Sequence, residues 1–160
     1  MVAGSINDEC AVAVSAQRLW KAAFAGDWDA LPKVCAGLID AVEVQGDGGP
    51  GTVSTMKFNP SVGVENVFKT RLISRDAAAG KVKSEVLQGD KVCAKLKSQV
   101  SEMQVQAAGD GACVVKLAVE YDTLDGAPLA PEDQATLTKG YLGLIKAAEA
   151  YLVAHPAEFA

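Results

Sequence analysis

The stretch VEVQGDGGPGTVSTMKF, from Val42 to Phe58, decides the fold of this chain. Polar and apolar residues alternate on both sides of a loop that is dense in glycine, and such alternation is typical of β-strands. Glycine reaches positive φ without a steric penalty, so the backbone can turn tightly here. The stretch therefore predicts a β-hairpin. Its tip is the glycine-rich loop of Gly46, Asp47, Gly48, Gly49, Pro50, Gly51 and Thr52.

A glycine-rich loop can also cradle phosphate, so the nucleotide-binding alternative has to be weighed. A P-loop needs Gly-Lys-Ser/Thr followed by a helix whose N-terminus holds the phosphate, and a Rossmann turn also leads into a helix. Here the residues from 52 to 55 are TVST, with no lysine and no helical period. The pattern favours an exposed hairpin tip over a nucleotide site.

Length and composition set wider bounds. A chain of 160 residues suits one domain, residues 1–160, and 49% hydrophobic with 22% charged residues is ordinary for a globular protein. The net charge of -5 argues against a general nucleic-acid binder, although it leaves room for a local basic patch. We identify no motif for a metal or a cofactor, and we expect neither.

The cysteines and the apolar runs bear on the compartment. Four widely spaced cysteines without a CxxC pair (Cys10, Cys35, Cys93 and Cys113) favour reduced core residues over a disulfide framework. We find no secretory signal and no apolar run of 18 residues, which predicts a cytoplasmic protein without a membrane contact.

The remaining pattern predicts an α+β order of elements. A first strand is expected over Ile6–Val14. Two short helices should follow, one capped by Ser15 and ending at Phe24, the other over Trp28–Cys35 and capped by Asp27. Short β-rich runs with regular turn signals from Leu38 to Tyr121 then indicate an antiparallel meander. A long helix should begin at Pro131 and reach about His155.

Two features hint at an internal space. Gly140 and Gly143 lie in the middle of the long helix, where they either allow close packing on the sheet or leave room for a ligand. In the run KLKSQVSEMQV, one face carries Gln99, Ser101, Met103 and Val105, and the other carries Leu96, Ser98, Val100 and Glu102. The face with Glu102 is the poorer candidate to point into a core, because a buried carboxylate is costly. The face with Gln99 and Ser101 mixes polar and apolar residues, which a wetted amphipathic pocket would tolerate.

Several motifs in order give the chain a family resemblance. They are SAQRLWKAAF (15–24), ALPKV (30–34), GDGGPGT (46–52), VEY (119–121) and KAAEAYLVAHPAEF (146–159). With these motifs the whole chain resembles the plant pathogenesis-related class-10 proteins, the family of the major birch pollen allergen, and it is most similar to the grass-type members.

The resemblance implies a seven-stranded curved antiparallel sheet wrapped around the long C-terminal helix, with two short helices and a large internal cavity. Members bind amphipathic plant molecules such as flavonoids, cytokinins, steroids and fatty acids, and take part in defence and stress responses. Val82 and Ser84 stand where relatives often have tyrosine, which implies a roomier pocket. Carried over by position, the ligand-binding wall would include Met56, Phe58, Val67, Val82, Ser84, Gln99, Ser101, Met103, Val115, Leu117, Leu137, Gly140 and Leu144.

Ribonuclease activity is the alternative from another class, with RNA as a weaker candidate partner. Some relatives are reported as ribonucleases, and the resemblance places Glu149 and Tyr151 on the matching helix pair. The loop lysine of the proposed site is Ser54 here, and the late-strand glutamate falls on Lys97. Half of the constellation is therefore missing, and the two helix residues do not share a face. Whether the chain is an enzyme stays open.

Two further relatives of this fold are disfavoured. Abscisic acid receptors carry gate and latch motifs that the segments NPSVGVE (59–65) and LQGDKVC (87–93) lack. Condensing enzymes of alkaloid synthesis use a cavity lysine, whereas Lys116 is predicted on an outward face. The only histidine, His155, lies at the helix end, where the macrodipole favours a cation. We expect a monomeric carrier of amphipathic small molecules.

Overall fold

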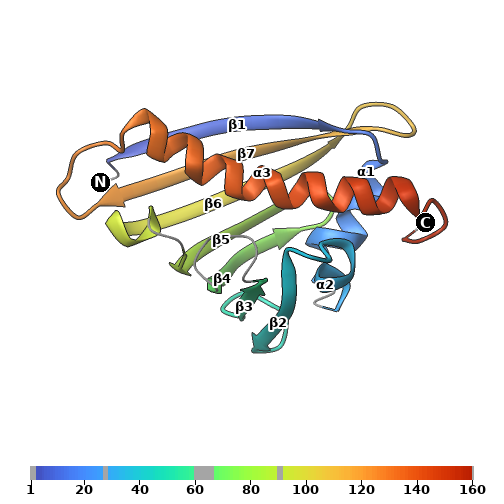
Figure 1. The fold of residues 1–160 in the computed structure, drawn as a ribbon, viewed down its shortest axis with the longest axis horizontal. Coiled ribbons are helices and arrows are strands. Elements are labelled where there is room, and N and C mark those ends of the chain that lie inside the picture. The colour runs from blue at the N-terminus through green and yellow to red at the C-terminus, as the bar shows by residue number, and fades with distance from the viewer. Residues whose placement is uncertain (1–2, 27–28, 60–66, 90–91, 160) are drawn as a thin grey trace.

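A computed structural model describes residues 3–26, 29–59, 67–89 and 92–159. The chain forms seven strands, one long helix and several short helical segments (Figure 1). The strands are β1 (Gly4–Val12), β2 (Ile39–Gln45), β3 (Val53–Phe58), β4 (Val67–Asp76), β5 (Lys81–Gln88), β6 (Leu96–Ala107) and β7 (Cys113–Thr123). The helical segments are α1 (Ala16–Leu19), the π-helix η1 (Trp20–Phe24), α2 (Ala30–Val34), the 3₁₀ turn η3 (Cys93–Lys95) and α3 (Pro131–Ala154).

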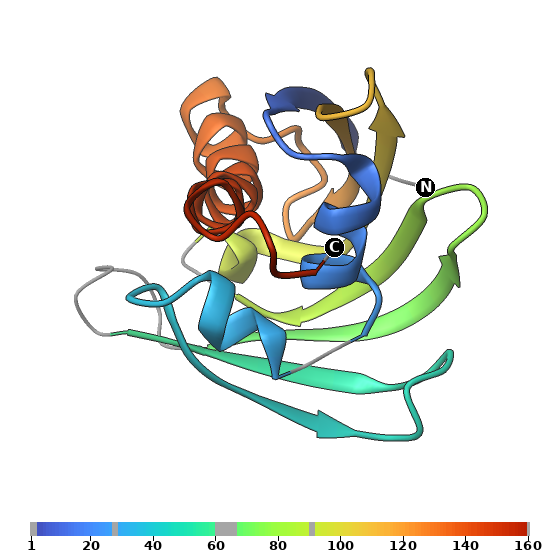
Figure 2. The same ribbon diagram turned by 90° about the vertical axis from the view of Figure 1, so that its right-hand side faces the viewer.

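The strands form one antiparallel sheet in the order β1-β7-β6-β5-β4-β3-β2. Figures 1 and 2 show the sheet curving around α3, with α1, η1 and α2 gathered near the C-terminal end of that helix. Register shifts interrupt the β2–β3, β4–β5 and β6–β7 ladders, and such bulges bend strands. The predicted α+β architecture, with a seven-stranded curved sheet around the long helix, is confirmed.

The long helix begins and ends as its sequence predicts. Pro131 occupies the first turn, with Glu132 and Asp133 beside the positive end of the helix dipole. Its other end is held by Arg18, whose guanidinium donates to the carbonyl oxygens of Leu152 (3.0 Å), His155 (2.9 Å) and Glu158 (3.0 and 3.1 Å). These carbonyls lie at the helix end, where intrahelical donors run out. Arg18 therefore fixes the end of α3 against the short helices.

The first elements differ from the prediction in their bounds. β1 runs over Gly4–Val12 instead of Ile6–Val14, because the chain leaves the sheet at Ala13, whose N–H donates to Glu149 Oε2 at 2.6 Å. Ser15 caps the first helical segment as predicted, accepting from the N–H of Arg18 at 3.3 Å. The second helix is shorter than predicted, at Ala30–Val34, and its expected cap Asp27 lies outside the described residues.

Two clusters of buried side chains lie at opposite ends of the space between sheet and helix. One joins the short helices to the C-terminal half of α3, around Leu19, Val34 and Leu152. The other packs the N-terminal half of α3 against β7, around Val119 and Tyr121. All four cysteines carry free thiols, and Cys35 and Cys113 are buried. None of the helices in the described ranges is both long and apolar enough to cross a membrane.

Candidate ligand-binding cavity

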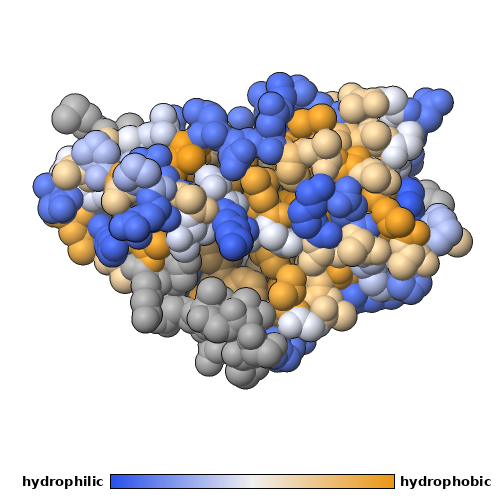
Figure 3. Space-filling model, turned by 45° about the horizontal axis from the view of Figure 1, so that its top comes forward, coloured by the Kyte–Doolittle hydropathy of each residue, from blue (hydrophilic) through white to orange (hydrophobic). Residues whose placement is uncertain are grey.

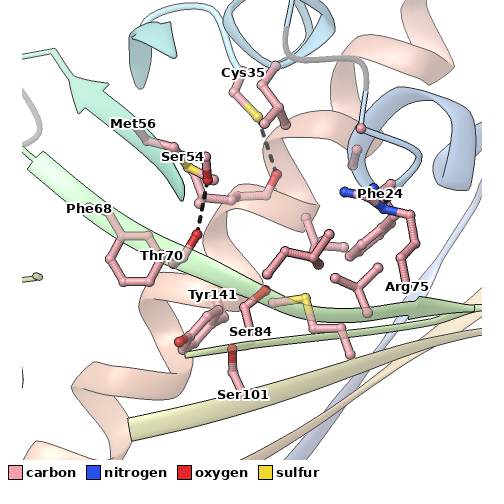
Figure 4. Close-up of a pocket in the computed structure, with 18 of the residues that line it drawn as sticks. Phe24, Cys35, Ser54, Met56, Phe68, Thr70, Arg75, Ser84, Ser101 and Tyr141 are labelled. Carbon is pink, nitrogen blue, oxygen red and sulfur yellow. Dashed lines mark hydrogen bonds between the residues drawn. The ribbon is translucent and has the colours of Figure 1, made fainter. Parts of the chain in front are cut away.

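A mostly apolar pocket lies between the two clusters, lined by the inner face of the sheet, α3 and the short helices (Figure 4). Its volume is about 150 Å³, which is below the ~300–1,000 Å³ typical of small-molecule sites. Figure 3 shows hydrophobic residues gathered around a hollow near the middle of one face. The described lining residues are Ala23, Phe24, Gly26, Leu31, Cys35, Thr52, Ser54, Met56, Phe68, Thr70, Leu72, Arg75, Val82, Ser84, Ser101, Met103, Tyr141, Leu144 and Ile145.

Six hydroxyl groups interrupt the apolar wall, those of Thr52 and Tyr141 and four on the inner strands. Ser54 Oγ and Thr70 Oγ1, on neighbouring strands, lie 3.0 Å apart and bond to each other. Ser84 and Ser101 are also direct cross-strand neighbours. Within the described part of the chain, neither of these two hydroxyls has a hydrogen-bond partner, although Ser101 is only 6% exposed. The cavity thus offers two adjacent hydroxyls that a bound molecule can engage.

The mixed face of β6 points inward, as the sequence favours. Gln99 (2% exposed), Ser101 and Val105 are buried, whereas Lys97 and Ser98 are exposed. Gln99 avoids the cost of an unpaired amide because its Nε2 donates to Tyr141 Oη at 2.9 Å and its Oε1 accepts from Cys93 Sγ at 3.3 Å.

A single cation stands among the described lining residues. Arg75 donates from Nε to the carbonyl oxygen of Phe24 (2.9 Å) and from Nη1 to that of Gly48 (3.1 Å), so it ties η1 to the glycine-rich loop. Gly26, at φ +91°, lies against this guanidinium, where a Cβ would come within 3.1 Å of Nη1. Burial lowers the pKa of Arg75 from its ordinary value. Arg75 therefore closes one end of the cavity by joining two separate segments.

The only cysteine in the described wall is Cys35. Burial raises the pKa of its thiol to about 11, and its Sγ lies 3.7 Å from the carbonyl oxygen of Leu144. The thiol is protonated at neutral pH and acts as a small apolar group.

The structure brings together six of the thirteen residues predicted for the wall. The residues that line the cavity are Met56, Val82, Ser84, Ser101, Met103 and Leu144. Others pack nearby without lining it: Phe58 and Val115 belong to the cluster under the short helices, and Leu117 and Leu137 to the cluster at the other end. Gln99 lies behind Tyr141, and Val67 is half-buried at the start of β4, opposite Lys57.

The helix glycines do not take the predicted place. Gly140 is exposed and does not line the cavity, so the prediction that it belongs to the ligand-binding wall is wrong. A Cβ at Gly140 or Gly143 would meet nothing within 4 Å. Neither close packing on the sheet nor room for a ligand explains these glycines, because both lie on the outer side of α3.

Sequence reasoning missed the aromatic part of the wall. Phe24, Phe68 and Tyr141 all line the cavity, and the Phe68 and Tyr141 rings meet edge to face with centroids 5.8 Å apart. Phe68 is the cross-strand partner of Met56, and Tyr141 follows Leu137 by four positions on the helix, so both could have been found from periodicity. The small side chains of Val82 and Ser84 do not give a large cavity, because these rings share the wall.

The glycine-rich loop is a hairpin tip, as predicted. The N–H groups of Gly48 and Gly49 donate within the loop to Thr52 Oγ1 and Asp47 Oδ1, both at 2.9 Å. Those of Gly51 and Thr52 donate to the carbonyl oxygens of Leu72 (2.8 Å) and Gly49 (3.0 Å). Four amides that could cradle a phosphate are therefore already used, which agrees with the choice of hairpin over nucleotide site.

Glu149 and Tyr151, the ribonuclease candidates, point to different neighbours. Glu149 accepts from Ala13 N and from Lys146 Nζ (3.2 Å) beside β1. Tyr151 donates to Glu158 Oε2 at 2.5 Å, in a network with Lys33 beyond the end of α3. The structure does not bring the two side chains together.

Other chemistry is also sparse. No group of three or more His, Cys, Asp and Glu residues that could hold a metal ion exists in the described ranges. Lys116 is exposed, on the outward face predicted for it, and the described wall contains no lysine. The gate segment compared with hormone receptors falls mostly on residues 60–66, outside the described residues.

Comparison with known proteins agrees with this geometry. The chain is 31% identical over 161 residues to pathogenesis-related protein 1 of Asparagus officinalis, covering 99% of each chain. It is 31% identical over 143 residues to the major pollen allergen Aln g 1 of Alnus glutinosa, covering 89% of each.

Solved structures share the fold. The crystal structure of Ara h 8.0201 superposes with a TM-score of 0.77 at 23% identity, covering 94% of this chain and 98% of that one. Norcoclaurine synthase from Thalictrum flavum, in complex with dopamine and hydroxybenzaldehyde, gives 0.69 at 25% identity, covering 95% and 87%. The model of the pathogenesis-related protein Bet v 1 family matches residues 1–155. The chain therefore belongs to the pathogenesis-related protein Bet v 1 family.

Proposed function

We propose that this protein is a cytoplasmic defence and stress-response carrier that binds amphipathic small molecules in the cavity between sheet and α3. The candidate ligands are flavonoids, cytokinins, steroids and fatty acids. The observation that carries the proposal is the pair of hydroxyls of Ser84 and Ser101, which have no hydrogen-bond partner among the described residues and lie in a mostly apolar wall. A dry core would leave these groups without compensation, whereas a ligand with a hydroxyl or carbonyl group would engage them.

The relatives support the same reading. The relatives compared above are named a pathogenesis-related protein and a pollen allergen, and the structure of norcoclaurine synthase is a complex with dopamine and hydroxybenzaldehyde. Carriage of a ligand needs a pocket and orienting polar groups, and no nucleophile or base. The described cavity has these features: the pKa of the Cys35 thiol is raised, and Arg75 donates to backbone carbonyl oxygens.

Ribonuclease activity receives no specific support. The candidate pair Glu149 and Tyr151 is engaged at two separate places, and the loop amides are used within the hairpin. General acid–base cleavage of RNA requires both groups within reach of one phosphate.

The test is displacement of a polarity-sensitive dye such as ANS by the four ligand classes. Wild type should bind the dye saturably, and at least one class should displace it. Ser84→Tyr fills the cavity from its wall and should weaken binding at least tenfold. Ser74→Tyr adds the same ring at an exposed position of β4 and is the matched control. Equal binding by wild type and Ser84→Tyr, with both proteins folded, would overturn the proposal.

A further inference from the structure

A second pocket lies where β5 and β6 separate. Their ladder ends at Glu85↔Val100, although β5 continues along β4 to Gln88 and β6 already pairs with β7 from Leu96. The space between these two strand ends, which do not pair with each other, is about 310 Å³. The described lining residues are Val86, Leu87, Gln88, Gly89, Cys93, Ala94, Leu96, Lys97, Ser98 and Gln99.

One layer of side chains divides this second pocket from the ligand cavity. Gln99 lines the second pocket, Tyr141 lines the cavity, and the two are joined by the 2.9 Å hydrogen bond from Nε2 to Oη. Cys93 supports Gln99 from the second pocket, and Phe68 packs edge to face on Tyr141 from the cavity. We call the Gln99–Tyr141 pair the partition.

The two pockets differ in chemistry. The cavity is apolar with a few hydroxyls, whereas the second pocket carries the amides of Gln88 and Gln99, the hydroxyl of Ser98 and the ammonium of Lys97. Among its described lining residues there is no carboxylate. Such a set of donors suits an anionic group such as a carboxylate.

The volumes point the same way. The cavity alone is smaller than the usual ligand site, and the two pockets together reach the usual range of ~300–1,000 Å³. Opening the partition breaks the hydrogen bond from Gln99 to Tyr141, and the amide of Gln99 can keep its bond from Cys93 Sγ only if it stays on the side of the second pocket. A carboxylate that passes it can accept from the released Gln99 Nε2, so the buried donor keeps a partner.

We propose that the partition opens to long-chain carboxylic acids, which bind with the chain in the cavity and the carboxylate beside Lys97 in the second pocket. The proposal rests on the proposed carrier function and deepens it. It makes Gln99, Tyr141 and Lys97 the residues that select for chain length and for an acidic end. The acid is ionised at neutral pH, so the Lys97 ammonium favours it over an alcohol of the same length.

The first test compares dodecanoic acid with 1-dodecanol by displacement of ANS at pH 7.5. Wild type should prefer the acid, and Lys97→Met should weaken acid binding about fivefold or more while leaving the alcohol unchanged. Lys97 is exposed, so this variant folds normally. Lys116→Met, on the outward face of β7, is the control and should behave as wild type. The same ratio of acid to alcohol affinity in wild type and Lys97→Met would overturn the proposal.

The second test addresses the partition. Tyr141→Phe keeps the ring and removes the bond to Gln99, so dodecanoic acid should bind a few-fold more tightly while hexanoic acid, which the cavity holds alone, does not change. Tyr151→Phe removes a hydroxyl from the same helix away from both pockets and should have no effect. No change in dodecanoic acid affinity for Tyr141→Phe would contradict the partition.

The outcomes separate the two proposals. If wild type binds a flavonoid or a cytokinin but does not prefer the acid to the alcohol, and the variants leave the affinities unchanged, only the partition proposal fails. If wild type binds none of the probes, the carrier function fails and the partition proposal fails with it.

Discussion

Removing the Ser101 hydroxyl should stabilise the empty protein and lower its affinity for the ligand. Ser101 is 6% exposed and its hydroxyl has no hydrogen-bond partner in the described part of the chain. A fully buried hydroxyl without a partner costs ~1–3 kcal/mol, but the Ser101 oxygen keeps some exposure to the cavity. Water can reach this one from the cavity, so the gain from Ser101→Ala should be about 1 kcal/mol. For a domain of this size that raises the melting temperature by about 2–4 °C.

The same substitution removes a group that orients the ligand. One hydrogen bond contributes ~0.5–1.5 kcal/mol, so a hydroxylated flavonoid should bind about two- to twelvefold more weakly. Circular dichroism melting of the empty protein and calorimetric titration of the ligand measure the two effects. Ser74→Ala, at an exposed site on β4, should change neither. A lower melting temperature for Ser101→Ala would refute the reasoning, because it would show that the hydroxyl stabilises the empty protein. Unchanged affinity for every hydroxylated ligand would also refute it, because it would show that no ligand bonds to this hydroxyl.

Three further predictions test other parts of the structure. Arg18→Met removes the charged donor from three carbonyl oxygens at the end of α3 and should lower the free energy of unfolding by about 2–3 kcal/mol in urea titration, whereas Arg71→Met on the exposed face of β4 should cost little. Cys35, with its pKa raised to about 11, should resist iodoacetamide at pH 8 until the protein unfolds; fast labelling of the native protein would contradict its burial. Hydrogen bonds from Lys33 and then Tyr151 lower the pKa of Glu158, so the stability that it contributes is present above its unfolded pKa near 4.5 and is lost as pH falls through the lower folded pKa. In Lys33→Met this acid-side loss should be smaller in melting experiments, and an unchanged pH profile would argue against the network.

Much of the fold follows from local rules. Alternation around the glycine-rich loop predicts the β2–β3 hairpin, and Pro131 with the acidic residues after it marks the start of α3. The inward face of β6 could also be chosen, because Glu102 on the other face made the alternative costly. The bounds of β1 were wrong by two residues, since they depend on a distant contact, from Ala13 N to Glu149.

The cavity was harder to predict because it depends on which elements meet in space. Met56, Ser84 and Ser101 line the cavity, where the family resemblance had placed them. Gly140 was misplaced because a glycine in a helix does not reveal which side of the helix faces the sheet. Arg75 was missed because its role requires the end of η1 and the loop at Gly48 to come together, and neither is near it in sequence.

The central claim is that a small amphipathic molecule enters the cavity, and methyl NMR tests it most directly. The chain contains three methionines, of which Met56 and Met103 line the cavity and Met1 is the N-terminal residue. In protein labelled with ¹³C at the methionine methyls, titration with a ligand that displaces ANS should shift the Met56 and Met103 signals to saturation near one equivalent. Saturating ligand that leaves both cavity signals unmoved would contradict the account.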